Sequence, residues 1–525
     1  MEMDSVSPLV SAARAAGWLL RASRCARTDP RLRSVRSFAL LVGDGPRPVN
    51  ASTVSRWENG LLPLPFTVVR RYEEVLGLPS HSLVSVIETH LRYHGGRPVA
   101  GPPLGRPPTE DDDAAHRRLD ELLDRVLGED VVTGVEWDEL TSRLTTEGYR
   151  VTPSASRTAL CERLLDETIA SSGLPWMQRF EALSRLLAHG HWAEDIISLC
   201  ADAARDPYQA GLIEVVCLLD GSDRPAATAT VLRQLLRPTN GDAHLGALLA
   251  SVRKLRGGHF RPEEATTVAR AVAGLVHESA MAPEIAELVG ALIGSLPLSQ
   301  RERTAFTRRT TAHAGVQEVV RHGRLVEPGA GRVVLARVLS RVPALPAAHA
   351  GPDAVLANLV DEVLHHPVPD VRLYSAMLLR ASPYREAVAA SVAAELRSSA
   401  TLAAAERTIP LLQCLRVLGG PRQREAVMGL TVARGLPDSV VRAAIHAIGH
   451  VEGLSSQHYW HQLLRHHATG RRFQDAELKR LVYGMAMAGE AEILRHFATE
   501  GSGPLSALAA WWTNLPVHVR ASARA

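Results

Sequence analysis

Residues 49–60 carry the clearest local signal in the chain and read Val49-Asn50-Ala51-Ser52-Thr53-Val54-Ser55-Arg56-Trp57-Glu58-Asn59-Gly60. At 100° per residue, a helix over this segment places Val54 and Trp57 together on one side, where both can be buried. The opposite side carries, within an arc of about 100°, the polar residues Ser52, Ser55, Arg56 and Asn59. Asn50 can accept a hydrogen bond from the first turn, and Gly60 can end the helix in the left-handed conformation. The segment predicts a short helix with one buried and one polar edge.

The polar edge has the residue types that suit a helix lying in the major groove of DNA. Ser and Thr let the backbone approach the bases, and Arg reaches guanine or phosphate. The surrounding charge agrees, because residues 14–56 contain nine Arg and two Asp, a net charge of +7. Such a cluster is the electrostatic footprint of a phosphate-binding module. The alternative is a general preference for Arg, since the chain has only two lysines.

Length and composition bound the remaining possibilities. A chain of 525 residues is too long for one core and predicts several domains or a repeat array. With 46% hydrophobic and 4% aromatic residues, the composition favours an all-α fold. The formal net charge of +3 shows that the whole molecule is not a polycation.

The sequence also predicts the cellular compartment of the protein. Five scattered cysteines without a C-x-x-C pair indicate reduced core thiols: Cys25, Cys161, Cys200, Cys217 and Cys414. The first residues are acidic, and no uninterrupted apolar run approaches 18 residues, so we expect neither a signal peptide nor a membrane span. A cytoplasmic, nucleoid-associated protein with no membrane partner is predicted.

Five amphipathic helices are expected near the N-terminus, over residues 11–27, 34–42, 51–59, 66–76 and 81–93. Within this region three sequence words resemble the repressor-type helix-turn-helix domain of the lambda-repressor or XRE family: Leu20-Arg21-Ala22-Ser23-Arg24, Phe38-Ala39-Leu40-Leu41-Val42-Gly43 and Ser52-Thr53-Val54-Ser55-Arg56-Trp57-Glu58-Asn59-Gly60. The resemblance covers residues 9–93 and implies a domain that binds double-stranded DNA.

The resemblance also implies roles for individual residues. It implies the base-facing residues Ala51, Ser52, Ser55 and Arg56. It implies a phosphate contact by Asn59, and we further expect phosphate contacts by Asn50, Thr53, Arg47 and Arg33. Arg24 and Glu58 match an ion pair that ties the first helix to the base-reading helix.

The sequence departs from the family in two connections. Residues 44–48, Asp-Gly-Pro-Arg-Pro, stand where the family has a tight turn, and residues 28–33 lack its usual Gly-Leu-Ser. Such an insertion can change the angle between two helices. Arg47 either reaches the DNA backbone or a minor groove, or is a solvated loop charge.

Residues 95–113 are rich in Pro and Gly, end in an acidic run and predict a linker that tethers two bodies loosely. Helical patterning continues from residue 114 to 515. Arg372, Arg407 and Arg442 recur at intervals of 35 residues, and the region 325–495 resembles HEAT-type helical hairpins. The expected organisation is a five-helix DNA-binding domain (1–94), the linker (95–113), a helical region (114–324) and an α-solenoid of HEAT-like repeats with a C-terminal cap (325–525).

No catalytic motif stands out, and we expect no enzyme activity, catalytic residue, cofactor or metal. His446 and His450 are four residues apart and could hold a metal, but no Cys or carboxylate cluster completes a ligand shell. Trp511 and Trp512 fit the end cap of the array better than a ligand platform.

A sequence-specific transcription regulator is the preferred hypothesis. Its repeat region would bind a protein, peptide or small-molecule ligand and could form a homodimer. The rival is a protein-interaction scaffold in which the helix-turn-helix serves as a docking module. The two differ in whether the protein binds duplex DNA in a salt-dependent way.

Overall fold

The computed structural model describes residues 8–43, 49–95, 112–146, 151–278, 281–310, 313–345, 353–468, 475–500 and 504–525. These residues form 31 α-helices and no β-strand, which confirms the all-α class. None of the described helices combines the length and the apolar character that a membrane crossing requires. All five cysteines are buried and free.

The N-terminal block comprises residues 8–95. Its helices are α1 (Pro8–Cys25), α2 (Pro30–Arg33), α3 (Val35–Val42), α4 (Ala51–Glu58), α5 (Phe66–Leu76) and α6 (Ser82–Gly95). The sequence predicted five helices here, and the sixth is the four-residue α2. The carboxylate of Asp29 accepts a hydrogen bond from the Arg31 amide and Pro30 begins the turn, so two local residues create this helix.

Small residues bring α1 against the end of α4. A Cβ on Gly17 would collide with the Trp57 carbonyl oxygen, so only glycine permits this close approach. Gly60 ends the turn after α4 with φ of 67°, as the sequence predicted. The buried side chains of Phe38, Val54 and Tyr72 fill the space between these helices and α5.

The helical array comprises residues 112–525. Its first half contains α7 (Asp112–Leu127), α8 (Gly134–Thr146), α9 (Ser154–Ala170), α10 (Gly173–Ala188), α11 (Ala193–Ala203), α12 (Leu212–Leu218), a 3₁₀ turn (Leu219–Gly221), α13 (Pro225–Leu236), α14 (Gly241–Gly257), α15 (Pro262–Val276), α16 (Pro283–Ser295), α17 (Gln300–Arg309) and α18 (Ala314–His322). In this half, α12, α14, α16 and α18 pack in succession, as expected for helical repeats.

The second half continues the row of packed helices. It contains α19 (Pro328–Ser340), α20 (Ala354–His365), α21 (Pro369–Ala381), α22 (Arg385–Glu395), α23 (Ser399–Leu402), α24 (Ala405–Leu418), α25 (Pro421–Thr431), α26 (Asp438–Ile448), α27 (Gln457–Ala468), α28 (Asp475–Ala488), α29 (Ala491–Glu500), α30 (Pro504–Asn514) and α31 (Val517–Ser522). Here α21, α24, α26, α28 and α30 pack one after another.

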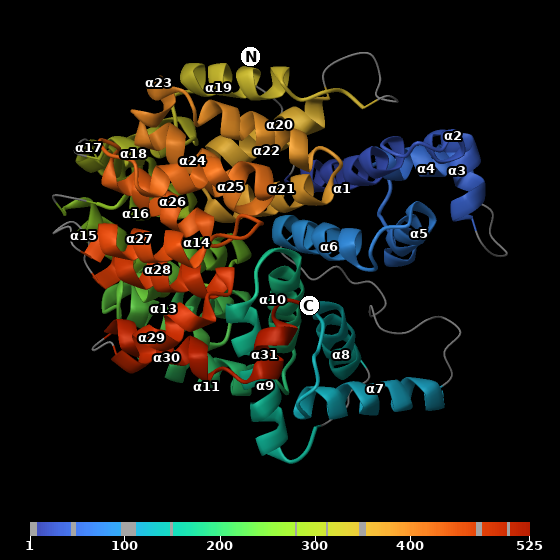
Figure 1. Ribbon diagram of the computed structural model, residues 1–525, viewed down its shortest axis with the longest axis horizontal. Helices are drawn as coiled ribbons and strands as arrows, with labels where there is room; N and C mark the ends of the chain where they lie inside the picture. Colours follow the sequence, from blue (N-terminus) through green and yellow to red (C-terminus); the bar gives the residue numbers. More distant parts are fainter. Residues whose placement is uncertain are drawn as a thin grey trace.

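The end of the array returns to its beginning. Helix α31 packs against α9, and the C-terminus lies beside α9 and α10 (Figure 1). The Val132 amide donates a 2.9 Å hydrogen bond to Ser522 Oγ, and the Arg179 guanidinium donates to the Ser522 carbonyl oxygen. The Trp511–Trp512 pair lies in α30, and Trp512 makes an edge contact with Tyr483 of α28.

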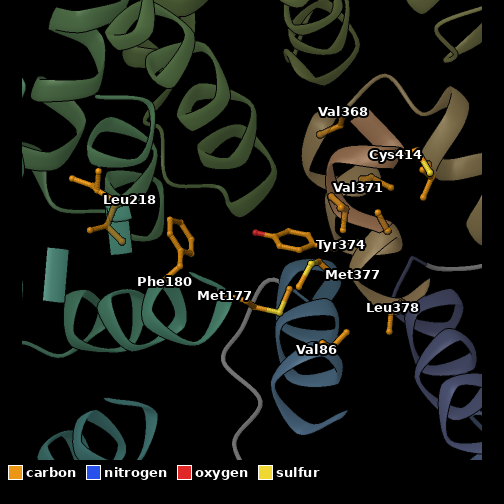
Figure 2. Packing of buried hydrophobic residues seen from close by; sticks show 14 of the residues in the cluster. Val86, Met177, Phe180, Leu218, Val368, Val371, Tyr374, Met377, Leu378 and Cys414 are labelled. Atoms are coloured by element: carbon orange, nitrogen blue, oxygen red, sulfur yellow. The ribbon is translucent and has the colours of Figure 1, made fainter. Parts of the chain in front are cut away.

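The N-terminal block packs directly on the array. Helix α6 contacts α10 and α21, and α1 contacts α20 and α21 (Figure 1). Figure 2 shows buried side chains of this junction, with Met177 on α10, Val86 on α6 and Met377 on α21. The expectation of two loosely tethered bodies is therefore wrong for the described part of the block. Most of the proposed linker, residues 96–111, lies outside the described residues.

Candidate nucleic-acid interface

Helix α4 forms where the sequence predicted it. The Asn50 side chain caps the helix by accepting hydrogen bonds from the Thr53 amide at 2.8 Å and the Thr53 hydroxyl at 3.0 Å. Val54 is fully buried and Trp57 is 8% exposed, so both anchor the helix from below.

The polar edge of α4, formed by Ser52, Ser55, Arg56 and Asn59, faces solvent, and Ala51 lies beside it. Ser52, Ser55 and Arg56 are exposed, and Ala51 is half-buried. Within the described part of the chain Arg56 forms no ion pair. Figure 1 shows α2, α3 and α4 at the end of the N-terminal block that points away from the array. The array therefore leaves this edge open to a partner.

The residues assigned to phosphate contacts have different surroundings. Asn50 is exposed and Thr53 half-buried, and both are engaged in the α4 cap. Asn59 is exposed, but its amide group donates to the Ser55 carbonyl oxygen at 2.7 Å. The Asn59 side chain is thus partly used in ending the helix. Arg33 is half-buried beside α3. Arg47 lies outside the described residues.

Two exposed arginines next to this surface were not among the sequence-based site residues. Arg36 is exposed on α3, which packs against α4. Arg14 is exposed on α1, and its backbone lies against Gly60 at the end of α4. Both belong to the basic cluster of residues 14–56, so the net charge of this segment was the sequence feature that could have identified them. Their exposure adds cations on two helices that pack against α4.

A buried ion pair fixes α4 to α1. Arg24 donates from Nε to Glu58 Oε1 at 2.6 Å and from Nη2 to Oε2 at 2.7 Å, while Arg24 Nη1 reaches the Arg33 carbonyl oxygen. Tyr72 of α5 donates to the same carboxylate at 3.1 Å. Burial, reinforced by the charge of Glu58, raises the pKa of Tyr72 well above its usual value. This network sets the position of the polar edge relative to α1, α3 and α5.

Polar and aromatic contacts hold the other end of the block on the array. Trp18 Nε1 donates to Asp353 Oδ2 at 2.7 Å, and its ring stacks on Tyr384 with 5.9 Å between centroids. Arg92 of α6 forms a bidentate ion pair with Glu181 of α10, with a 2.6 Å bond from Nε to Oε2. These contacts give α4 a fixed orientation relative to the array.

The described histidines of the array do not gather metal ligands. Among the described residues, no group of three or more His, Cys, Asp and Glu side chains has an arrangement that could hold a metal ion. His446 Nε2 accepts a hydrogen bond from Arg416 Nη1 at 2.7 Å, and burial lowers the pKa of His450 to about 3. Both rings are half-buried, His446 on α26 and His450 just after its end, and both line the interior wall of the array.

No protein family, curated protein or solved structure shows a significant match to this chain.

Proposed function

We propose that the protein is a sequence-specific DNA-binding transcription regulator. The N-terminal block would act as a repressor-type helix-turn-helix domain of the XRE type, and the array would be a HEAT-like solenoid that receives a ligand or partner and could dimerise. The supporting observation is the exposed polar edge of α4, held from behind by Val54, Trp57 and the buried pair of Arg24 with Glu58.

Charge and shape favour duplex DNA as the partner. Small side chains at Ser52 and Ser55 leave room for close approach of the backbone to base edges, and Arg56 is exposed and forms no ion pair with a described residue, so its fork can bind guanine. Arg14 and Arg36 flank the helix and are exposed, which suits phosphate contacts. The affinity would then come mainly from phosphates and the discrimination from α4.

Selection from a random-sequence duplex library with the full chain tests this proposal. The selected site should bind more tightly than a scrambled duplex, and affinity should fall steeply with salt. Arg56→Ala should relax the preference at one position by about 1–3 kcal/mol. Arg36→Ala should weaken all duplexes alike and lower the salt slope by about 1. Exposed Arg434, far along the array, provides the matched control Arg434→Ala. An unchanged sequence preference in Arg56→Ala would refute the assignment.

The second candidate is a protein-interaction scaffold, and exposed apolar side chains favour it. Leu40 on α3 is 77% exposed and Leu61, after α4, is 63% exposed. Apolar side chains beside the candidate interface are common where a protein partner or second copy docks. The scaffold hypothesis would be favoured over DNA binding by two results together. The protein would fail to bind duplex DNA even at low salt, and it would self-associate in a way that Leu40→Ser abolishes.

A further inference from the structure

The helical array forms a cavity of about 410 Å³ that is partly open to solvent. Its walls come from inner faces of both halves, including α12, α14, α16, α21, α24, α26 and α28. This volume is in the range of sites for small organic ligands. Apolar side chains such as Leu249, Met377 and Leu412 line it together with charged groups.

Most arginines of the cavity wall are neutralised by carboxylates. Arg253 binds Asp370 through two 2.6 Å hydrogen bonds and also pairs with Asp220. Arg372 pairs with Glu287 at 2.6 Å. These pairs tie α14 and α16 to α21 and are structural, since their charges are already compensated.

Arg416 of α24 is different. Its Nη1 lies 2.7 Å from His446 Nε2, and it forms no ion pair with any residue that the structure describes. Its other guanidinium nitrogens have no hydrogen-bond partner there, yet they are not shut off from the cavity space. A guanidinium held in the wall of a cavity without an ion pair is costly, because the nearby carboxyl group of Glu214 offsets its desolvation only in part. An entering anion would offset the remainder.

The surroundings of Arg416 define what kind of anion fits. Glu214 of α12 lines the same cavity and has no ion-pair partner among the described residues. Burial, with a smaller effect of Asp242, raises the pKa of Glu214 to about 7. Its acid form can donate a hydrogen bond to an oxyanion. The rings of His446 and Tyr483 stack on each other beside the guanidinium, with 5.9 Å between centroids.

We propose that this cavity binds a small organic acid, with its carboxylate on Arg416 and its apolar body against the apolar part of the wall. A carboxylate matches the planar guanidinium fork, which can form two parallel hydrogen bonds with it. Lys479 also lines the cavity without an ion pair among the described residues, so the wall offers two cations to the anion. The inference goes beyond DNA binding and does not rest on it.

The test compares the affinities of the full-length protein, without DNA, for carboxylic acids and for the corresponding neutral amides. Phenylalkanoates of increasing length, with phenylbutyrate as the first probe, are titrated by calorimetry beside the corresponding amides. We expect an acid of suitable length to bind and raise the melting temperature, and its amide to bind at least about tenfold more weakly. This comparison needs no variant, so it holds even if substitutions disturb folding.

Two matched variants locate the site. Arg416→Gln should remove the preference for acid over amide, while Arg434→Gln, at an exposed position outside the cavity wall, should keep it. The melting temperature of each variant without ligand reports whether it folds. The proposal is overturned if acids and amides bind equally, if none of the acids binds at millimolar concentration, or if folded Arg416→Gln retains the preference.

Discussion

Replacement of Arg24 by Met is the sharpest test of how α4 is held. The side chains of Arg24 and Glu58 are 3% and 2% exposed and share two short hydrogen bonds. Met retains much of the apolar stem and removes the charge. The Glu58 carboxylate would then stay buried with Tyr72 as its remaining side-chain donor. Breaking one partner of a buried pair costs about 3–5 kcal/mol, far more than the pair contributes relative to an apolar replacement.

Hydrogen exchange measured by mass spectrometry on the full chain detects this effect locally. Amides of residues 51–58 should exchange about a hundredfold faster or more, because 1.36 kcal/mol corresponds to tenfold. Arg31→Met is the matched control. Its pair with Asp29 has side chains 78% and 36% exposed, so the expected cost is about 0–1 kcal/mol.

The double variant Arg24→Met with Glu58→Leu separates a lost pair from an orphaned charge. Since it removes both charges, we expect it to recover much of the protection that Arg24→Met loses. If exchange of residues 51–58 were the same in Arg24→Met and the wild type, the pair would not be what holds α4. If the double variant were as labile as the single one, the orphaned carboxylate would not explain the loss.

Three further predictions concern the block and its seat on the array. Trp18→Phe removes the hydrogen bond to Asp353 and should cost about 1 kcal/mol of protection in α1 by hydrogen exchange. Gly60→Ala places a Cβ 2.6 Å from the Ala13 carbonyl carbon at a φ of 67°, and thermal denaturation should show a loss of more than about 1 kcal/mol. Burial lowers the pKa of His90 to about 3, so the folded state holds this ring neutral where the unfolded state would protonate it. The free energy of unfolding is therefore unaffected by His90 above about pH 6.5 and falls by about 1.4 kcal/mol per pH unit between about pH 6.5 and 3. His90→Phe should flatten that part of the pH dependence in urea unfolding, and an unchanged slope would contradict it.

Local signals made the site's own helix predictable. Asn50 and Gly60 mark the two ends of α4, and Val54 and Trp57 mark its buried side, all within twelve residues. Each of these signals acts through neighbours in the chain, so no tertiary information is needed. The same reasoning missed α2, because a four-residue helix is too short to show a hydrophobic period.

Neither the packing of the N-terminal block on the array nor the cavity in the array could be predicted from the sequence. Amphipathic spacing shows that one face of α6 is buried, but not that Arg92 meets Glu181, 89 residues further along the chain. Arg416 has the sequence context of a surface arginine on a helix. The packing of α24 between α21 and α26 places it in the cavity wall, and the sequence of α24 does not show which helices pack beside it.

One helix, α21, contacts both the N-terminal block that carries α4 and the cavity. Tyr374 of α21 lies against Tyr93 of α6, with 4.8 Å between ring centroids, while Met377 and Arg372 of the same helix face the cavity. A bound acid that shifts α21 would therefore change the contact between the array and the N-terminal block, which carries α4. Linkage requires reciprocity: if both proposals hold and the sites are coupled, DNA must change the affinity for the acid by the same factor as the acid changes the affinity for DNA. If the protein bound the acid with equal affinity with and without DNA, the two sites would be independent and α21 would not couple them.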